Sequence, residues 1–154
     1  GTSSIDELDD RSQEFPRGDE RRTGSELRYG MTVGGELAGD IRQPLLWHDL
    51  VDGTTTEVDF GPTSAAQEFV HVPRAGSTAE DDAWLVGFVS DRAESTTDLV
   101  VLAADDLGSG PVARVRKQLD PGGVAQSGGP GKEPRLRYRQ EKRPVRLRSQ
   151  RQEG

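Results

Sequence analysis

The chain of 154 residues is long enough for one small domain or for a piece of a larger one. Its hydrophobic fraction of 31% and mean hydropathy of -0.74 are low, so we expect a small or incomplete core. The net charge is -7 and there is no cysteine, which excludes disulfides and thiolate metal sites.

No apolar run is long enough to cross a membrane, and the N-terminus has no basic-then-apolar pattern of a signal peptide. The sequence therefore gives no clear membrane segment. We expect a cytoplasmic protein.

The first half of the chain predicts strands joined by turns. The strands are expected near Arg28–Val33, Leu45–Leu50 and Thr56–Phe60. Asp52-Gly53 supplies the positive φ that a tight hairpin favours. No helical period competes with this pattern, so a β-meander is predicted.

A second set of strands follows and is bounded by turn residues. These strands are expected at Phe69–Val72, Trp84–Ser90, Asp98–Ala103 and Val112–Arg116. Leu99 to Ala103 is apolar without alternation, which predicts a strand covered on both faces.

Three strands and then four make about two antiparallel blades of a β-propeller. A small β-sandwich has similar strand spacing, and the pattern alone favours neither fold. Two isolated propeller blades would expose faces and edges that neighbouring blades normally bury. An all-β body over residues 1–117 is predicted in either case.

The composition changes near residue 118. Residues 118–154 carry nine Lys and Arg against four Asp and Glu, and residues 1–117 carry eleven against twenty-three. The second segment is rich in Gly and Pro and has too little apolar surface to form a core. We expect residues 118–154 to be a disordered tail, with only weak helical potential in the last twenty residues.

Four motifs occur in order along the first segment. They are Gln13–Arg22 followed by Arg28-Tyr29-Gly30, then Gln67–Arg74, Ala79–Val89 and Asp98–Leu107. Together they resemble the C-terminal part of the carotenoid oxygenase family, which includes lignostilbene dioxygenases. The resemblance spans roughly Leu8 to Arg116. It implies a seven-bladed propeller, of which the N-terminal blades are missing from this sequence.

The resemblance also implies a chemistry. Members of this family hold Fe(II) with four histidines and cleave an alkene of a carotenoid or stilbene with O2 into two carbonyl products. Neutral imidazoles suit Fe(II), and open coordination positions admit O2. By motif position, Glu14 and Glu68 match glutamates that hydrogen-bond the iron-bound histidines without touching iron. Without the motifs, either would be read as a solvated surface side chain.

No iron ligand is identified in the sequence. His48 and His71 do not match ligand positions, and a lone strand histidine is more often a packing or surface residue. The family's last ligand lies in a Phe-His-Gly segment that should follow Val112–Arg116, but Lys117–Asp120 departs from it. We therefore expect no bound metal and no activity in this chain alone.

The abrupt departure motivates the hypothesis that the coding frame is lost near Arg116, since Arg, Gly and Pro enrichment is typical of an out-of-frame GC-rich gene. The acidic pairs Asp81-Asp82 and Asp105-Asp106 are interpreted as turns, because they lack the repeated ligands of a calcium loop. Gly34-Gly35 lacks the context of a phosphate loop.

Two other function classes remain. A non-catalytic β-rich interaction module would keep the propeller surface without the chemistry. An arginine-rich tail can also contact nucleic acid through phosphates. However, it has only Tyr138 for base stacking and follows an acidic body, so no nucleic-acid partner is predicted.

Overall fold

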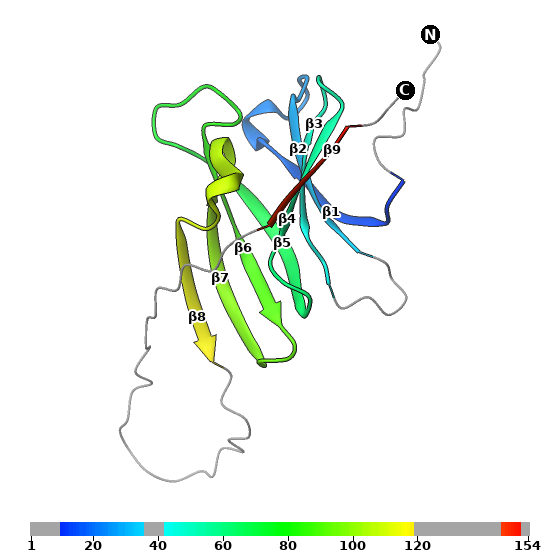
Figure 1. Cartoon of the computed structure of the whole chain (residues 1–154). Helices are drawn as coiled ribbons and strands as arrows, with labels where there is room; N and C mark the ends of the chain where they lie inside the picture. Colours follow the sequence, from blue (N-terminus) through cyan, green and yellow to red (C-terminus); the bar gives the residue numbers. More distant parts are fainter. Residues whose placement is uncertain (1–9, 36–41, 119–145, 152–154) are drawn as a thin grey trace.

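The computed structural model describes residues 10–35, 42–118 and 146–151, which form two packed β-sheets (Figure 1). Within these ranges the strands are β1 (Gln13–Gly18), β2 (Tyr29–Gly34), β3 (Leu45–Asp49), β4 (Thr54–Asp59), β5 (Ser64–Pro73), β6 (Ala83–Asp91), β7 (Thr96–Ala103), β8 (Ala113–Gln118) and β9 (Arg146–Arg151). Two 3-10 helices, η1 (Glu20–Arg22) and η2 (Ala104–Ser109), lie between them.

Each sheet is an antiparallel meander. Sheet A has the order β1-β2-β3-β4-β9, and sheet B has the order β5-β6-β7-β8. Consecutive strands pair in β1–β4 and again in β5–β8, so each sheet contains one four-stranded unit built from a continuous piece of chain. This is the arrangement of two consecutive propeller blades.

The core lies between the facing sides of the two sheets. Sheet A contributes Met31, Val33, Leu45, Trp47 and Val58, and sheet B contributes Ala66, Phe69, Ala83, Leu85, Val89, Val100 and Leu102. Ala104 and Leu107 of η2 close one end. Most of these residues alternate along their strands, because successive side chains of a strand point to opposite faces. One face of each blade is therefore buried against the other blade.

The predicted strands are present with shifted ends, and two strands, β1 and β9, are additional. β1 was not predicted as a strand. β5 begins at Ser64, five residues before the predicted start. The hairpin between β3 and β4 turns at Gly53 with φ of 60°, as predicted.

The prediction that Leu99 to Ala103 is covered on both faces is wrong. Val100 and Leu102 are fully buried, whereas Leu99 and Val101 on the opposite face are only half-buried. The reason is that sheet A covers only one side of sheet B.

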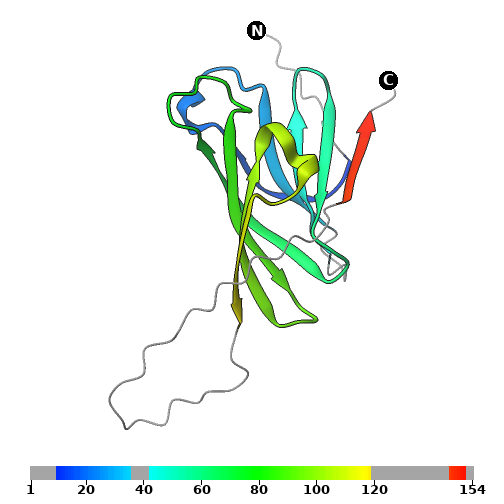
Figure 2. The same ribbon diagram turned by 60° about the vertical axis from the view of Figure 1, so that its left-hand side comes forward.

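The tail also differs from the expectation in one place. Residues 146–151 form strand β9 on the edge of β4 (Figure 2), where neither order nor a strand was expected. Residues 119–145 and 152–154 of the predicted tail lie outside the described residues. No helix in the described ranges is long and apolar enough to cross a membrane.

Candidate functional site

The first strand of each blade, called its inner strand from here on, carries the same tripeptide. Gln13-Glu14-Phe15 lies in β1 and Gln67-Glu68-Phe69 lies in β5. Both strands begin their blades and form sheet edges, and they contact each other. The two predicted site residues, Glu14 and Glu68, are therefore brought to neighbouring, equivalent strands.

Both inner strands are bulged at this tripeptide. In β1, Glu14 pairs with Val33 and Arg17 with Met31, so two residues on β1 oppose one on β2. In β5, the residues Gln67 and Glu68 similarly oppose one residue of β6. Phe15 has a φ of 54°, which is uncommon for a residue with a side chain. Bulges re-aim side chains and are frequent next to functional sites.

The two glutamates have different surroundings. Glu14 is exposed. Glu68 is 42% exposed at its side chain, and its Oε1 accepts a hydrogen bond of 2.8 Å from Nε of Arg17. This ion pair joins β1 to β5. The proposed contacts of Glu14 and Glu68 with metal-bound histidines stay predictions.

Phe69 of the tripeptide is held by a glycine on the next strand. Its ring is 1% exposed, and it lies against Gly87 of β6. A Cβ at position 87 would fall 2.4 Å from two ring atoms of Phe69, so only glycine leaves room for the ring there. The glycine therefore fixes the side chain directly after Glu68.

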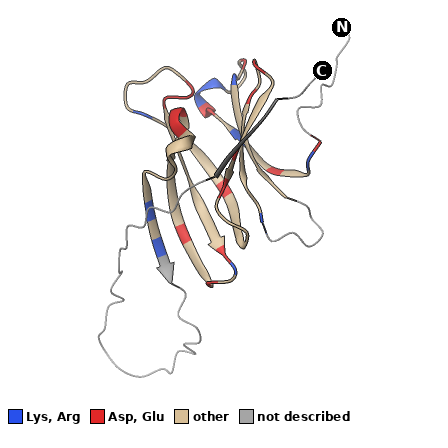
Figure 3. Cartoon of the chain, viewed as in Figure 1, with Lys and Arg blue, Asp and Glu red and all other residues tan. Residues whose placement is uncertain are grey.

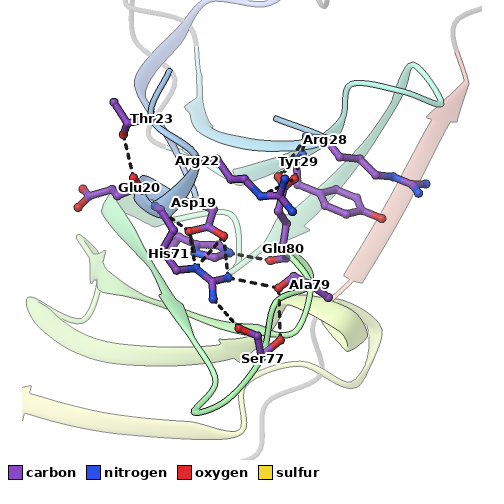
Figure 4. A network of polar contacts seen from close by, with 11 residues as sticks. Asp19, Glu20, Arg22, Thr23, Arg28, Tyr29, His71, Ser77, Ala79 and Glu80 are labelled. Atoms are coloured by element: carbon purple, nitrogen blue, oxygen red, sulfur yellow. Dashed lines mark hydrogen bonds and ion pairs between the residues drawn. The ribbon is translucent and has the colours of Figure 1, made fainter. Parts of the chain in front are cut away.

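A buried polar network joins the two blades beside this strand pair (Figure 4). Asp19 caps η1, and its buried carboxylate accepts hydrogen bonds from the backbone N–H and the guanidinium of Arg21. These bonds, chiefly those from the Arg21 side chain, hold the pKa of Asp19 below its usual range although burial acts to raise it. His71 of β5 places its Nδ1 4.0 Å from Asp19.

Glu80, in the loop between β5 and β6, completes this network. Its carboxylate accepts hydrogen bonds of 3.1 Å and 3.2 Å from the backbone N–H groups of Arg28 and Tyr29 in the other blade. The main-chain carbonyl of Glu80 accepts a hydrogen bond of 2.7 Å from Nε2 of His71. The His71 ring also stacks on Trp47, with planes 1° apart. Sequence reasoning quoted Glu80 only as part of a motif and missed its role.

His48 lies on the far face of sheet A from this network. It is 5% exposed, and its ring nitrogens contact the hydroxyls of Thr32 and Thr55, each at 2.9 Å. The ring is thus a packed, hydrogen-bonded element between β2 and β4. The structure does not bring His48 and His71 together, because the His48 ring lies on the face of sheet A that points away from sheet B, whereas the His71 ring stacks on Trp47 at the face toward sheet B.

Asp81-Asp82 lies in the loop between β5 and β6, and Asp105-Asp106 lies in η2. Asp82 and Asp105 both accept hydrogen bonds from the guanidinium of Arg74, which also covers the ring of Trp84 at 4.2 Å from its centroid. Asp106 caps the backbone N–H of Ser109 within η2. Figure 3 shows the acidic residues on η2. Among the described residues, no group of three or more His, Asp or Glu could hold a metal ion.

Two consecutive four-stranded antiparallel blades, each with a bulged first strand, define a piece of a β-propeller. The family model for the retinal pigment epithelial membrane protein matches residues 1–120. The chain belongs to this family, that of the carotenoid cleavage oxygenases.

Curated relatives agree with the family match. A carotenoid cleavage oxygenase of Mycobacterium tuberculosis is 37% identical over 107 residues, which cover 66% of this chain and 21% of the relative. Apocarotenoid-15,15'-oxygenase of Synechocystis is 33% identical over 105 residues, which cover 67% of this chain and 21% of the relative. The chain thus spans about a fifth of the length of these relatives.

Solved structures of the family have the same fold. Cobalt-substituted Synechocystis apocarotenoid oxygenase is 29% identical with a TM-score of 0.66, over 72% of this chain and 24% of that one. The lignostilbene dioxygenase of Pseudomonas brassicacearum is 30% identical with a TM-score of 0.65, over 71% and 25%. The prediction of two all-β propeller blades is confirmed.

Proposed function

We propose that this chain is a C-terminal portion of a non-haem Fe(II) dioxygenase. The whole enzyme would cleave an alkene of a carotenoid, an apocarotenoid or a stilbene with O2 to two carbonyl products. The observation that carries the proposal is the pair of bulged inner strands β1 and β5, each with a Gln-Glu-Phe tripeptide, in a chain of the carotenoid oxygenase family.

In the whole enzyme, Glu14 and Glu68 would accept hydrogen bonds from the N–H groups of histidines that bind iron. Such a contact fixes the ring orientation and makes the other nitrogen a better ligand. The Arg17 guanidinium supports this role at Glu68, because its Nε donates to Oε1 of Glu68 over 2.8 Å and so holds the carboxylate in place beside β1.

The described residues do not fit an iron site by themselves. Both ring nitrogens of His48 are engaged by threonine hydroxyls, and Nε2 of His71 donates to a main-chain carbonyl. The two rings lie on opposite faces of sheet A. We therefore propose that this chain alone neither holds iron nor catalyses the reaction.

The outward face of sheet B supports the view that more of a propeller covers it. Val70, Val86 and Val101 lie side by side across β5, β6 and β7, and Phe88 pairs with Leu99 in the neighbouring row. Val70 is 45% and Phe88 49% exposed. Large apolar side chains gathered on one sheet face are typical of a surface that another element buries.

The first test is the iron content of the purified chain after anaerobic loading with Fe(II), with circular dichroism on the same sample. We expect a β-rich spectrum without stoichiometric iron. Tightly held, stoichiometric iron in a folded chain would contradict the proposal, and it would require that His48 or His71 leave the contacts described above.

A chimera tests the glutamates. Residues 10–116 would replace the corresponding segment of Synechocystis apocarotenoid oxygenase, which supplies the remainder of the enzyme. Glu14→Gln and Glu68→Gln are each expected to weaken iron retention by about 10- to 100-fold. Glu94→Gln, an exposed glutamate in the turn between β6 and β7, is the matched control and should retain iron fully. Equal retention in all three would contradict the assigned role.

We also propose that the reading frame changes near Arg116. The support is that the family match ends at residue 120, within a few residues of the predicted change in composition. Sequencing the locus tests this point. A shifted frame that encodes Phe-His-Gly is expected, and the absence of such a segment from both other frames would contradict it.

A further inference from the structure

A cavity of about 350 Å³ lies between the two blades, where η2 faces sheet A. The rings of Tyr29 and Trp47 form one wall, and the buried residues Ala104 and Leu107 of η2 add apolar surface. The other described lining residues are Asp49, Thr54, Thr56, Asp81, Asp105, Asp106 and Gly108. The two rings stack with centroids 5.3 Å apart and planes 14° apart, so this wall is formed in advance of any ligand.

The described lining of this cavity is acidic. It contains four aspartates and no lysine or arginine. Two of the four are neutralised from outside the cavity. A guanidinium nitrogen of Arg28 lies 2.8 Å from the carboxylate of Asp49. A guanidinium nitrogen of Arg74 lies 2.8 Å from the carboxylate of Asp105.

The other two aspartates, Asp81 and Asp106, keep their negative charges. Neither carboxylate forms an ion pair with any other residue of the chain, although Asp106 accepts a hydrogen bond from the backbone N–H of Ser109. Burial raises the pKa of the Tyr29 hydroxyl, and the negative charges of Asp49 and Asp81 raise it further. The field within the cavity therefore favours a cation.

Trp47 supplies a donor that has no acceptor. Its indole N–H makes no hydrogen bond to any residue, yet the nitrogen is not sealed from solvent. Trp47 is only 6% exposed and lines the cavity, so the free N–H is directed into it. A buried donor is normally paired, and an acceptor atom within the cavity would satisfy this one.

The arrangement suits an organic ligand better than a metal ion. Among the described residues, no group of three or more His, Asp or Glu is close enough to hold a metal ion. Two unpaired carboxylates, one N–H donor and apolar walls lie at different points of the cavity instead. Small-molecule sites commonly combine a largely apolar hollow with a few placed polar groups.

We propose that this cavity binds a small organic cation that also carries a hydrogen-bond acceptor, such as a guanidinium or ammonium group joined by a short stem to a carbonyl or hydroxyl oxygen. Asp81 and Asp106 attract the cation, and the indole N–H of Trp47 donates to the oxygen. The stem lies against Ala104 and Leu107. This role goes beyond the oxygenase function proposed above and does not depend on it.

A pair of probes tests the charge of the ligand. N-acetylargininamide has a guanidinium group, an aliphatic stem and amide oxygens, and N-acetylcitrullinamide has nearly the same shape with a neutral urea group. Trp84→Phe leaves Trp47 as the single fluorescent reporter, because the chain has two tryptophans. We expect saturable fluorescence change with the arginine compound and at least about tenfold weaker binding of the citrulline compound.

Calorimetry on the unmodified chain repeats this comparison without the substitution. Equal affinities for the two probes would overturn recognition by charge. Absence of saturable binding of the arginine compound would overturn the site.

Substitution of the unpaired carboxylates tests their role. Asp81→Asn with Asp106→Asn should weaken binding of N-acetylargininamide by about tenfold or more. Glu20→Gln with Glu94→Gln removes the same charge at exposed positions outside the cavity and should leave the affinity within about twofold. Circular dichroism checks that both double variants fold. An equal loss in both would mean that only the net charge of the chain matters, and it would overturn the proposal.

Trp47→Phe tests the N–H donor, because it keeps an aromatic ring and removes the hydrogen bond. By calorimetry, N-acetylargininamide should bind about fivefold more weakly to this variant. 1-Butylguanidine, which has no oxygen, should bind the variant and the parent within about twofold of each other. An equal loss of affinity for both compounds would overturn the assignment of the indole N–H as a ligand donor.

Discussion

The backbone N–H of Tyr29 donates to the carboxylate of Glu80 over 3.2 Å, so a side chain of one blade accepts a main-chain hydrogen bond from the other. Arg28 donates to the same carboxylate, and His71 donates to the Glu80 carbonyl. The interface between the blades is therefore held by directional polar contacts as well as by the apolar core. These contacts fix the position of β5 relative to the start of β2.

Removal of this carboxylate is expected to destabilise the chain. Glu80 is 8% exposed, so Glu80→Ala would leave two main-chain N–H groups without their partner in a buried place. We expect a loss of about 2–3 kcal/mol in the free energy of unfolding. Urea unfolding measures it. Glu94→Ala, in an exposed turn, is the control, and an equal effect of both substitutions would contradict the assigned role.

The contact between Phe69 and Gly87 gives a second prediction. Gly87→Ala should cost about 1–3 kcal/mol, because the new methyl group would overlap the buried ring. Gly30→Ala is the matched control in β2, where the nearest atom to a new Cβ would be 3.9 Å away. Thermal unfolding of both variants distinguishes the steric effect from a general effect of replacing a strand glycine. Equal thermal unfolding midpoints for Gly87→Ala and Gly30→Ala would contradict the steric effect at Phe69.

Much of the fold could be predicted from alternation and turn residues. β6 and β7 have strong β-branched and aromatic patterns, and their ends lie within two residues of the predicted ones. β1 was missed because Pro16 and the bulge interrupt its pattern. The start of β5 was missed because Ser64-Ala65-Ala66 has small side chains that carry little strand signal.

The site was only partly accessible from the sequence. The motifs that resemble the carotenoid oxygenase family led to Glu14 and Glu68, which the fold places on the neighbouring strands β1 and β5. Glu80 was missed because its role depends on main-chain groups 51 and 52 residues away, which no local pattern reveals. β9 was missed because its composition, with three arginines and one large apolar residue, indicates solvation rather than a strand.

Asp19 predicts an acid dependence of stability. The pKa of Asp19 is lowered in the folded chain, chiefly by the hydrogen bond from the Arg21 side chain. In the unfolded chain the same carboxyl has a pKa of about 3.9. The folded state therefore binds the proton less tightly than the unfolded state. The resulting stabilisation is present above this value and is lost as the pH falls through the folded pKa.

Asp19→Asn tests this dependence, since asparagine can still cap the N–H of Arg21 but carries no charge. We expect the variant to be less stable than the parent by about 1–3 kcal/mol at pH 7, with a smaller difference at pH 3. Asp52→Asn, at a carboxylate 61% exposed, should change stability by less than about 1 kcal/mol at either pH. A difference for Asp19→Asn that does not depend on pH would contradict the argument.

The apolar face of sheet B should bind a fluorescent apolar dye. Val70 and Phe88 are among its most exposed members, and Val70→Thr with Phe88→Thr would remove apolar area while retaining residues suited to a strand. We expect dye fluorescence to fall about two-fold or more with little change in unfolding midpoint, since exposed positions usually alter stability by less than about 0.5 kcal/mol.

Val51→Thr is the control for this measurement, because Val51 is 70% exposed but lies at the tip of the β3–β4 hairpin, away from sheet B. Its substitution should leave dye binding unchanged. An equal decrease would mean that the dye responds to scattered apolar side chains. A decrease confined to the Val70 and Phe88 variant would locate the largest uncovered apolar surface on the face where the proposed whole enzyme requires its next blade.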